Sequence, residues 1–395
     1  MTKIIKDSLL QYQESKETCI FSIYKLIKIL FYTFEKTSVL KKQKTALVCP
    51  LNWGLGHATR IIPIIQLLLK YKIKVMVAAD GHASLLLKKE FPELEFITLK
   101  GYEVRFSATK TQLFKMAVLS VKIIYHTFKE HQELKKIIKK NNIRIVLSDN
   151  RFGLWGKKVY SIFISHQLQL HLPKAFGFIN YIYQKTFKYI VSHYNECWTP
   201  DLEGDLNLAG KLSHPKYKLT NLKYIGILSR FCHRQKHTND IKTIDVLFIL
   251  SGPEPQRSIF EKIIYEQTKG KTEKIVLVRG TEKISDFNFS FPVYNLLPSQ
   301  ELEELISQSD LIVCRPGYSS VMDLVALGKN ALLIPTPGQT EQEYLASHLE
   351  KNKLFNWSRQ DKFKYEMIFE VVNDNNTGIL RHSFVEKEIS RLSEL

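Results

Sequence analysis

The chain has 395 residues, of which 44% are hydrophobic and 24% charged, and this balance excludes a disordered or fibrous protein and allows two globular domains. Its five cysteines are scattered and form no CxxC pair, which argues against a disulfide framework and favours a reducing cytoplasm. The net charge of +18 is concentrated in residues 1–240, whereas the remaining residues carry a slight excess of acid. A basic half favours an anionic partner, either a lipid surface or a nucleic acid.

Residues 1–43 are predicted to be an N-terminal helical extension. Residues 19–32 are apolar but contain Lys25 and Lys28, so the segment is too short and too charged to span a bilayer. Because the two lysines share one helix face, the helix suits the plane of an anionic membrane surface. The alternatives are a helix packed on the protein body and a mis-assigned start codon. No cleavable signal peptide is recognisable, so we expect a cytoplasmic protein, peripheral on the inner face of the plasma membrane.

From residue 44 onward, short apolar strands alternate with helices, the pattern of a parallel α/β sheet. The first series belongs to a predicted domain of residues 44–231, with strands at 45–51, 74–80, 95–99, 143–148 and 159–165 and helices at 58–70 and 112–139. The second belongs to a predicted domain of residues 241–395, with strands at 245–250, 274–279, 293–297, 311–313 and 331–334. The polar segment 232–242 is the expected linker.

The clearest functional signal is the segment 314–338, CRPGYSSVMDLVALGKNALLIPTPG. It predicts a strand, a glycine turn, a short helix that ends at Gly328, and a second strand that ends at Pro335. The backbone N–H groups of such a turn, together with the positive end of the helix, can hold an anion. Asp323 on that helix can accept hydrogen bonds from a ribose diol.

This segment resembles the donor site of a glycosyltransferase subgroup that includes the transferase adding N-acetylglucosamine to the lipid-linked peptidoglycan precursor and the plant galactolipid synthases. The shared features are a Gly–(Ser/Thr)–x–x–(Glu/Asp) run, a Pro-ended strand and a Gln-rich helix start, here QTEQE at 339–343. The resemblance implies the α/β fold called GT-B, in which two Rossmann-like parallel-sheet domains face each other across a cleft. It also implies that a nucleotide sugar, most naturally UDP-linked, binds the C-terminal domain. Its expected contacts there are Gly317, Ser319 and Ser320 at the phosphates, Asp323 at the ribose, and Gln342 and Glu343 at the sugar.

Two further loops of the second domain are candidates for donor binding. The loop after strand 245–250 corresponds to one that contacts the donor diphosphate in the resembled family, and its candidate residues are Ser251, Gly252, Gln256 and Arg257. Prolines at 253 and 255 remove backbone donors from this loop, so an arginine that neutralises the leaving diphosphate gains importance. Arg279 and Gly280 follow the next strand and are candidates for the nucleobase site.

The first strand leads into residues 52–60, NWGLGHATR, and then a helix. Gly54 and Gly56 allow the backbone to approach a ligand closely, which makes them candidates for the acceptor site. Thr59 occupies the third glycine position of GxGxxG, so the dinucleotide fingerprint fails. His57 matches a histidine that faces the acceptor and donor phosphates in the resembled family, and it is a candidate general base. The alternative is a histidine that only caps the helix.

Polar residues follow two later strands of the first domain, at the edge where parallel sheets place their ligands. Asp149 is a second candidate base, Arg151 a candidate anion contact, and His166 a candidate lining residue of the acceptor site. The Asp149–Asn150 pair is equally consistent with a simple turn. His166 and His171 lack a ligand spacing, so we expect no metal.

The resemblance therefore implies an inverting, metal-independent glycosyltransferase that needs no cofactor. It would move a hexose or N-acetylhexosamine to a hydroxyl of a lipid-linked or cell-envelope acceptor held by the basic domain. A nucleic-acid partner is disfavoured because the basic residues do not interleave with aromatic ones. The alternatives are a UDP-N-acetylglucosamine 2-epimerase-like enzyme and a non-catalytic membrane-surface protein of the same fold, which the proline-containing loop at 253–255 favours.

Overall fold

The computed structural model describes residues 45–52, 55–101, 112–169, 177–231, 243–371 and 383–394. The predictions for the extension 1–43, the linker 232–242 and Gly54 lie outside these residues.

Seven parallel strands form the N-terminal sheet, in the order β3-β2-β1-β4-β5-β6-β7. They are β1 (Thr45–Pro50), β2 (Lys74–Ala79), β3 (Glu95–Thr98), β4 (Ile145–Asp149), β5 (Tyr160–Ile164), β6 (Glu196–Thr199) and β7 (Leu222–Tyr224). The helices of this domain are α2 (Leu55–Lys70), α3 (Gly81–Glu90), α4 (Gln112–Asn141) and α5 (Gly177–Val191), with a 3-10 turn η2 (Gly210–Leu212).

Both faces of this sheet are covered, and the alternation of side chains along β1 shows how. Ala46 and Val48 pack into the apolar cluster that includes α2 and α3, whereas Leu47 and Cys49 pack into the cluster that includes α4. The central strands are therefore apolar at nearly every position, as buried parallel strands require. Their polar side chains appear at the carboxyl ends, which places functional groups at one edge of the sheet.

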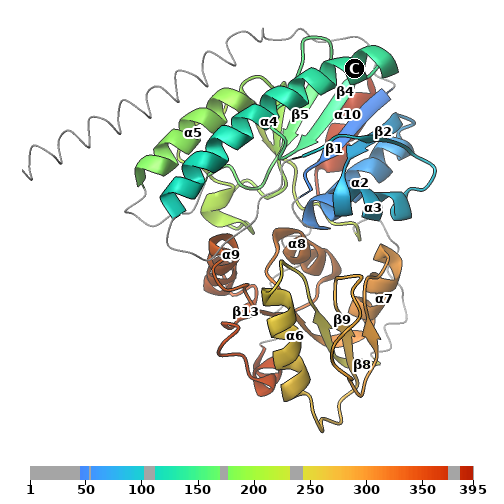
Figure 1. The fold of residues 1–395 in the computed structure, drawn as a ribbon, viewed down its shortest axis with the longest axis vertical. Coiled ribbons are helices and arrows are strands. Elements are labelled where there is room, and N and C mark those ends of the chain that lie inside the picture. Colours follow the sequence, from blue (N-terminus) through green and yellow to red (C-terminus); the bar gives the residue numbers. More distant parts are fainter. Residues whose placement is uncertain are drawn as a thin grey trace, which may run out of the picture.

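Six parallel strands form the C-terminal sheet, in the order β10-β9-β8-β11-β12-β13. They are β8 (Ile244–Ile249), β9 (Ile275–Val278), β10 (Val293–Tyr294), β11 (Ser309–Cys314), β12 (Leu332–Leu333) and β13 (Asn356–Trp357). The helices are α6 (Gln256–Gln267), α7 (Ser299–Gln308), α8 (Tyr318–Leu327) and α9 (Thr340–Lys351), with a 3-10 helix η3 (Tyr365–Glu370). Figure 1 shows the two domains one above the other, with α8 and α9 of the lower domain beneath the upper one.

The last helix, α10 (Val385–Glu394), lies within the predicted domain of residues 241–395 in sequence but contacts the N-terminal domain. It packs on α2 of the N-terminal domain, beside which it lies in Figure 1. Glu386 accepts a hydrogen bond from Tyr71, and Arg391 pairs with Glu196 of β6 at 2.7 Å. The apolar face of α10, which includes Val385 and Ile389, is buried in the core cluster of α2.

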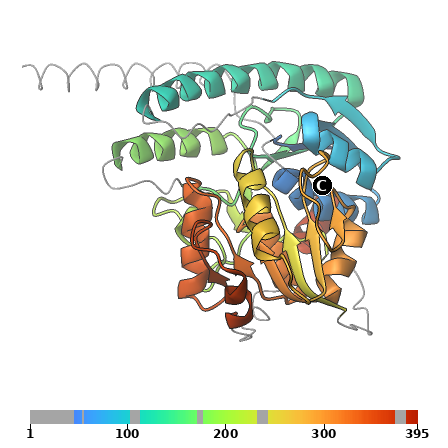
Figure 2. The ribbon, with the colours of Figure 1, turned by 60° about the horizontal axis from the view of Figure 1, so that its bottom comes forward.

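The predicted parallel α/β architecture with two strand series is confirmed. The sequence reading missed β6, β7 and β13, which are at or near sheet edges and only two to four residues long. Helices α4 and α5 lie side by side on the outer surface of the N-terminal domain in two views (Figures 1 and 2). Within the described ranges, no helix is long and apolar enough to cross a bilayer.

Candidate active site

His57 and Asp149, the two predicted candidate bases, are brought together in the N-terminal domain. Asp149 ends β4 and is fully buried, and His57 lies in the first turn of α2. Asp149 Oδ2 is 2.9 Å from His57 Nδ1, so the carboxylate favours the tautomer in which Nδ1 carries the proton. His57 Nε2 is then an acceptor, which is the state that a general base requires.

Arg60, one helical turn after His57, completes this arrangement. It is 2% exposed, and its Nη2 donates a short hydrogen bond to Asp149 Oδ1. Burial alone would raise the pKa of the Asp149 carboxyl, but Arg60 and His57 outweigh burial and hold this pKa below its usual value. Asp149 is therefore an ionised partner that orients His57, and this role differs from that of a general base.

His166 continues the network toward the second domain. Its Nδ1 accepts a hydrogen bond of 2.8 Å from Arg60 Nη1, and its Nε2 donates one of 2.8 Å to Glu341 Oε1 on α9. The ring stacks on Tyr318 of α8, with 4.3 Å between the centroids and 6° between the planes. Burial is the main cause that lowers the pKa of His166, so the ring is neutral at pH 7.

The start of α8 faces the start of α2 across the domain interface. Ser319 Oγ donates a hydrogen bond of 2.8 Å to the carbonyl of Gly56. A Cβ at Gly56 would lie 3.3 Å from this same oxygen, so the position suits glycine. Gly317 is the N-cap residue of α8 and makes no side-chain capping bond, and Ser320 lies in the first turn, half-exposed. The sequence prediction of a glycine turn followed by a short helix ending at Gly328 is confirmed.

Asp323, the predicted ribose contact, lies in the domain junction and is 6% exposed. Its Oδ1 accepts a hydrogen bond of 2.6 Å from Ser229, and its Oδ2 a longer one of 3.3 Å from Arg230 Nε. Burial raises the pKa of Asp323 above its usual value even though both partners oppose this. Both carboxylate oxygens therefore already bond to protein groups, and the bond to Arg230 is the longer of the two.

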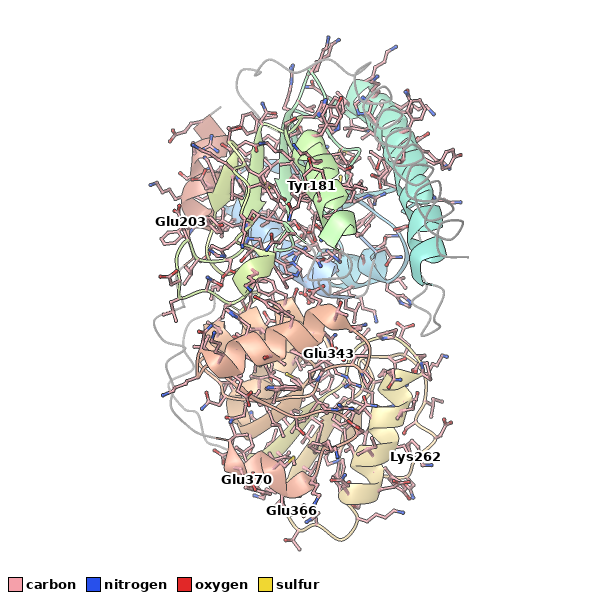
Figure 3. The ribbon with its side chains drawn as sticks, turned by 90° about the vertical axis from the view of Figure 1, so that its left-hand side faces the viewer. Tyr181, Glu203, Lys262, Glu343, Glu366 and Glu370 are labelled. Atoms are coloured by element: carbon pink, nitrogen blue, oxygen red, sulfur yellow. The ribbon has the colours of Figure 1, made fainter. Side chains whose placement is uncertain are left out.

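Gln342 and Glu343, predicted to bind sugar hydroxyls, point back to the loop that follows β12. Gln342 Oε1 accepts from the N–H of Thr336 at 2.8 Å, and Glu343 Oε1 from the N–H of Gly338 at 3.2 Å. Figure 3 shows Glu343 on the lower domain, close to the interface. These two oxygens fix the loop 336–338, so both residues shape the site.

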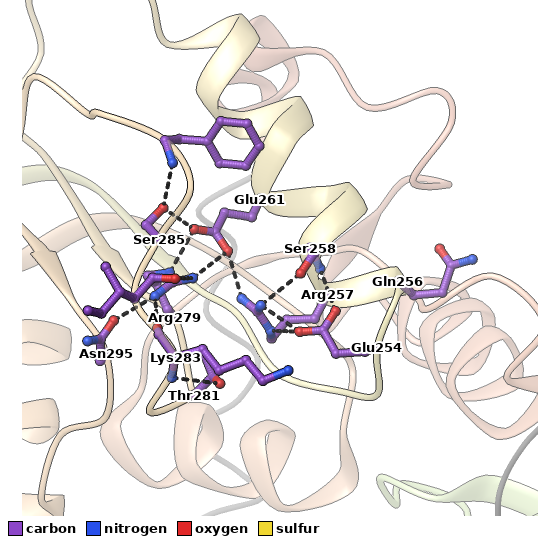
Figure 4. A network of polar contacts seen from close by, with 12 residues as sticks. Glu254, Gln256, Arg257, Ser258, Glu261, Arg279, Thr281, Lys283, Ser285 and Asn295 are labelled. Carbon is purple, nitrogen blue, oxygen red and sulfur yellow. Dashed lines mark hydrogen bonds and ion pairs between the residues drawn. The ribbon is translucent and has the colours of Figure 1, made fainter.

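Arg257, the predicted diphosphate contact, is buried and fully engaged by protein groups (Figure 4). Its Nε and Nη1 donate to Glu254 and Glu261, each at 2.7 Å, and its Nη2 donates to Ser258 at 2.9 Å. The expectation that Arg257 neutralises the leaving diphosphate does not fit this placement, because the carboxylates on either side already balance its charge.

Arg279, the predicted nucleobase contact, shares Glu261 with Arg257 (Figure 4). Its Nε donates to Glu261 Oε1 at 2.7 Å, and its Nη1 bonds to Asn295 Oδ1 at 2.7 Å and to the carbonyl of Lys283. The side chain is 2% exposed and holds the loop after β9 in place. The guanidinium of Arg279 is therefore held by protein groups, and the predicted direct contact between Arg279 and a nucleobase does not fit this placement.

The remaining donor-loop candidates lie in the two loops that Glu261 ties together. Gly280 has φ of +65°, and a Cβ there would be 2.4 Å from the carbonyl of Leu250, so only glycine fits. Gly252 has φ of +101° and is exposed, and Ser251 beside it is half-exposed. The side-chain oxygen of Gln256 accepts a hydrogen bond of 3.0 Å from Gln360. Ser251 and Gly252 are thus the loop residues most open to a ligand.

Arg151 is not an anion contact in this structure. Its guanidinium is fully buried in the N-terminal domain, where it pairs with Glu130 at 2.8 Å and donates to the carbonyl of Leu99 at 3.1 Å. Among the described residues, no group of three or more His, Cys, Asp or Glu side chains is arranged to hold a metal ion.

Arg60, Tyr318 and Glu341 were not singled out from the sequence, although each lies inside a segment that was. Arg60 follows His57 by three residues, so the two share a helix face. Tyr318 lies between two predicted phosphate contacts, and Glu341 directly precedes the predicted Gln342. The helix spacing was the available signal for Arg60, whereas the contacts of Tyr318 and Glu341 depend on how the domains meet.

The fold of the chain is that of the GT-B glycosyltransferases, as shown by solved structures of low sequence identity. The calicheamicin glycosyltransferase CalG4 superposes with a TM-score of 0.56 at 9% identity, covering 89% of this chain and 93% of that one. A glycotransferase of kitacinnamycin gives a TM-score of 0.55 at 12% identity, covering 89% and 94%.

Residues 246–391 match the glycosyltransferase family 28 C-terminal domain. The expected resemblance is thereby confirmed for the C-terminal domain. The match runs from β8 into α10 and includes the segment 314–338 with its glycine turn and helix α8.

Three relatives carry the name UDP-N-acetylglucosamine–N-acetylmuramyl-(pentapeptide) pyrophosphoryl-undecaprenol N-acetylglucosamine transferase. That of Sulfurihydrogenibium sp. (strain YO3AOP1) is 27% identical over 25% of this chain and 27% of its own. That of Buchnera aphidicola subsp. Schizaphis graminum (strain Sg) is 31% identical over 32% and 39%. That of Clostridioides difficile (strain 630) is 22% identical over 66% and 65%. The chain thus matches less than two thirds of the length of each relative.

Proposed function

We propose that this protein is a glycosyltransferase that moves a hexose or N-acetylhexosamine from a UDP-sugar to a hydroxyl of a lipid-linked or cell-envelope acceptor. The observation that carries the proposal is the His57–Asp149 pair, held at 2.9 Å where the N-terminal domain meets a family 28 C-terminal domain. The named relatives, which carry N-acetylglucosamine and a lipid-linked acceptor in their name, support the substrate class.

The chemistry we propose is a single in-line displacement with inversion. The acceptor oxygen forms a bond to the anomeric carbon while the bond from that carbon to the diphosphate oxygen breaks. The electron pair of the broken bond leaves with UDP, and the acceptor proton moves to Nε2 of His57. Asp149 stabilises the imidazolium that forms, because its carboxylate already accepts the Nδ1 proton.

The start of α8 is the proposed site of the leaving diphosphate. The helix has 10 residues and no side-chain cap, so its first amides and its positive end can face an anion. Ser320 and the exposed loop at Gly252 supply further donors. This arrangement stabilises the leaving group without using Arg257, and we propose that no metal is required.

The acceptor side has a surface that suits a membrane. Exposed on α4 and α5 are the aromatic residues Tyr125, Phe128 and Tyr181 and the basic residues Lys129 and Lys185, which we call the α4–α5 face. Tyr125, Phe128 and Lys129 share one face of α4, since they are three and four residues apart. We propose that this face binds the anionic inner surface of the membrane, where aromatic and basic side chains are favoured.

The direct test is a UDP-release assay with purified protein, a panel of UDP-sugars and bacterial lipid extract. The proposal predicts UDP release that depends on the extract, together with a glycosylated lipid of increased mass. UDP release without any acceptor would indicate an epimerase-like or hydrolytic reaction instead. If no UDP-sugar binds at millimolar concentration, the protein is not an enzyme of this class.

A further inference from the structure

We propose that Glu341 of the C-terminal domain is a positioning residue for the base of the N-terminal domain and acts through His166 and Arg60. Contact between the two domains would then complete the orientation of His57. The inference rests on the proposed function, because it concerns the same base, and it assigns a role to three residues that the proposed reaction does not use.

The first link crosses the domain interface. Glu341 lies in the first turn of α9, and its Oε1 accepts the Nε2–H of His166 at 2.8 Å. His166 is 6% exposed, whereas the Glu341 side chain is 36% exposed at the edge of the interface. Tyr318, which is also in the C-terminal domain, stacks on the other side of the ring. The orientation of this N-terminal histidine is therefore set by two residues of the other domain.

The second link turns that orientation into a position for Arg60. Because Nε2 of His166 carries the proton given to Glu341, Nδ1 is an acceptor for Arg60 Nη1 at 2.8 Å. A proton on Nδ1 would point at the guanidinium and repel it, so Arg60 and Glu341 both favour the Nε2–H tautomer. Without Glu341, the Nε2 proton loses the acceptor that fixes the rotation of the ring. Glu341 thus holds the ring in the orientation that Arg60 needs.

The third link reaches the base. Arg60 Nη2 bonds to Asp149 Oδ1, the carboxylate that also faces His57 Nδ1. Nη2 also lies 3.0 Å from His57 Nδ1, which is a close contact and not a hydrogen bond when Nδ1 gives its proton to Asp149. A guanidinium is planar and fixes its bonding directions as one unit. Loss of the bond at Nη1 therefore lets the whole group rotate, and with it the carboxylate that holds His57.

An ordinary packing contact does not account for this arrangement as well. Hydrogen bonds join five side chains in series, Glu341–His166–Arg60–Asp149–His57, and both ring nitrogens of His166 take part. A second hydrogen bond between the domains, from Ser319 to the carbonyl of Gly56, lies close to His57. The contact between the domains is therefore made next to the candidate base. A purely structural contact would not need to end at the candidate base.

The test is a double-mutant cycle on Glu341 and His166. Glu341→Ala should lower kcat by roughly ten- to hundredfold, because small displacements of a reacting group have effects of this size. Its affinity for UDP should stay within about twofold. Glu341→Gln keeps an acceptor oxygen and should recover most of the activity. His166→Ala and the double variant should be no worse than Glu341→Ala, because the two residues act in series.

Glu350→Ala is the matched control on the same helix. Glu350 is exposed, and it accepts a hydrogen bond from Trp357 of its own domain. The control should keep the wild-type kcat. The proposal is overturned if Glu341→Ala keeps the wild-type kcat, or if the losses of the two single variants multiply in the double variant.

A second measurement does not depend on turnover. Nitrogen NMR of the histidine side chains should show the Nε2–H tautomer of His166 in the wild type. Glu341→Ala should change the signals of both His166 and His57, and Glu350→Ala should change neither. Unchanged His57 signals in Glu341→Ala would overturn the inference. A wild-type protein that lacks turnover but shows these changes would instead overturn only the proposed function.

Discussion

Asp149 holds His57 through a hydrogen bond of 2.9 Å from Nδ1 to Oδ2, and this contact decides which ring nitrogen is available for chemistry. With Nδ1 committed to the carboxylate, Nε2 remains to take a proton from an acceptor hydroxyl. A general base at this place is worth about 10²–10⁴ in rate.

His57→Ala should therefore lower kcat by about two to four orders of magnitude and leave the affinity for UDP within about twofold. Steady-state kinetics and calorimetric titration with UDP separate the two effects. His82→Ala, an exposed histidine on α3, is the control and should behave as wild type. A His57→Ala variant with full activity would assign the proton transfer to another group.

Asp323→Ala tests whether a ribose diol takes the place of Arg230 at this carboxylate. If the ribose takes the place of Arg230, loss of its charge-assisted hydrogen bonds should weaken UDP binding by about 1.5–3 kcal/mol. That corresponds to roughly a ten- to hundredfold rise in the Kd measured by titration calorimetry. An unchanged Kd, with a lower melting temperature, would make Asp323 a junction residue that bonds only Ser229 and Arg230.

Glu261 stabilises the donor loops because it is shared by Arg257 and Arg279. Glu261→Gln should cost about 3 kcal/mol in the free energy of unfolding at neutral pH, because it leaves the buried guanidinium of Arg279 without its carboxylate partner, whereas Arg257 keeps Glu254. Burial tends to raise the pKa of Glu261, but its bonds to Arg279, Ser285 and Arg257 lower this pKa below the usual 4.5.

A lowered carboxyl pKa fixes the direction of the pH effect. The contribution of Glu261 should be complete above pH 4.5 and should fall away as the pH drops below that value. Denaturant titrations from neutral to acid pH should thus show wild type and Glu261→Gln converging at low pH. Glu266→Gln, an exposed partner of Lys262 on the same helix, should change stability by at most about 0.5 kcal/mol. Equal effects of the two substitutions would contradict this account.

Membrane binding through the α4–α5 face should depend on its lysines. Lys129→Glu combined with Lys185→Glu should reduce binding to phosphatidylserine vesicles by roughly tenfold or more, since each lysine near such a surface contributes about 1 kcal/mol. Cosedimentation at low and high salt measures the effect. The matched control is the double variant Lys262→Glu and Lys274→Glu, which changes two exposed lysines of the C-terminal domain. Figure 3 shows Lys262 far from Tyr181 of α5. Equal losses in both double variants would show that only net charge matters.

The sequence was sufficient for the architecture and for the central strands, because buried parallel strands are apolar throughout and end in polar residues. It also placed His57, Asp149 and His166 at the same sheet edge, which follows from strand polarity alone. The short edge strands β7 and β13 carry too few apolar residues to stand out. The return of α10 to the N-terminal domain depends on a long-range contact that no local pattern contains.

Side-chain direction was the part that the sequence could not supply. Within QTEQE at 339–343, Glu341 reaches His166 across the interface, whereas Gln342 and Glu343 turn back to the loop 336–338. Successive residues on a helix point about 100° apart, so the outcome depends on the residue at which α9 begins. Likewise, Arg257 suited a phosphate and Arg279 a nucleobase by position, but Glu261 engages both.

The central claim is most directly tested by measuring UDP release and lipid mass together, with purified protein, UDP-N-acetylglucosamine or another UDP-sugar, and bacterial lipid extract. The account predicts that UDP appears only with the extract, that one lipid gains the mass of one sugar residue, and that both signals nearly vanish in His57→Ala. The account is contradicted if, with every donor tested, no UDP is released and no nucleotide sugar binds at millimolar concentration.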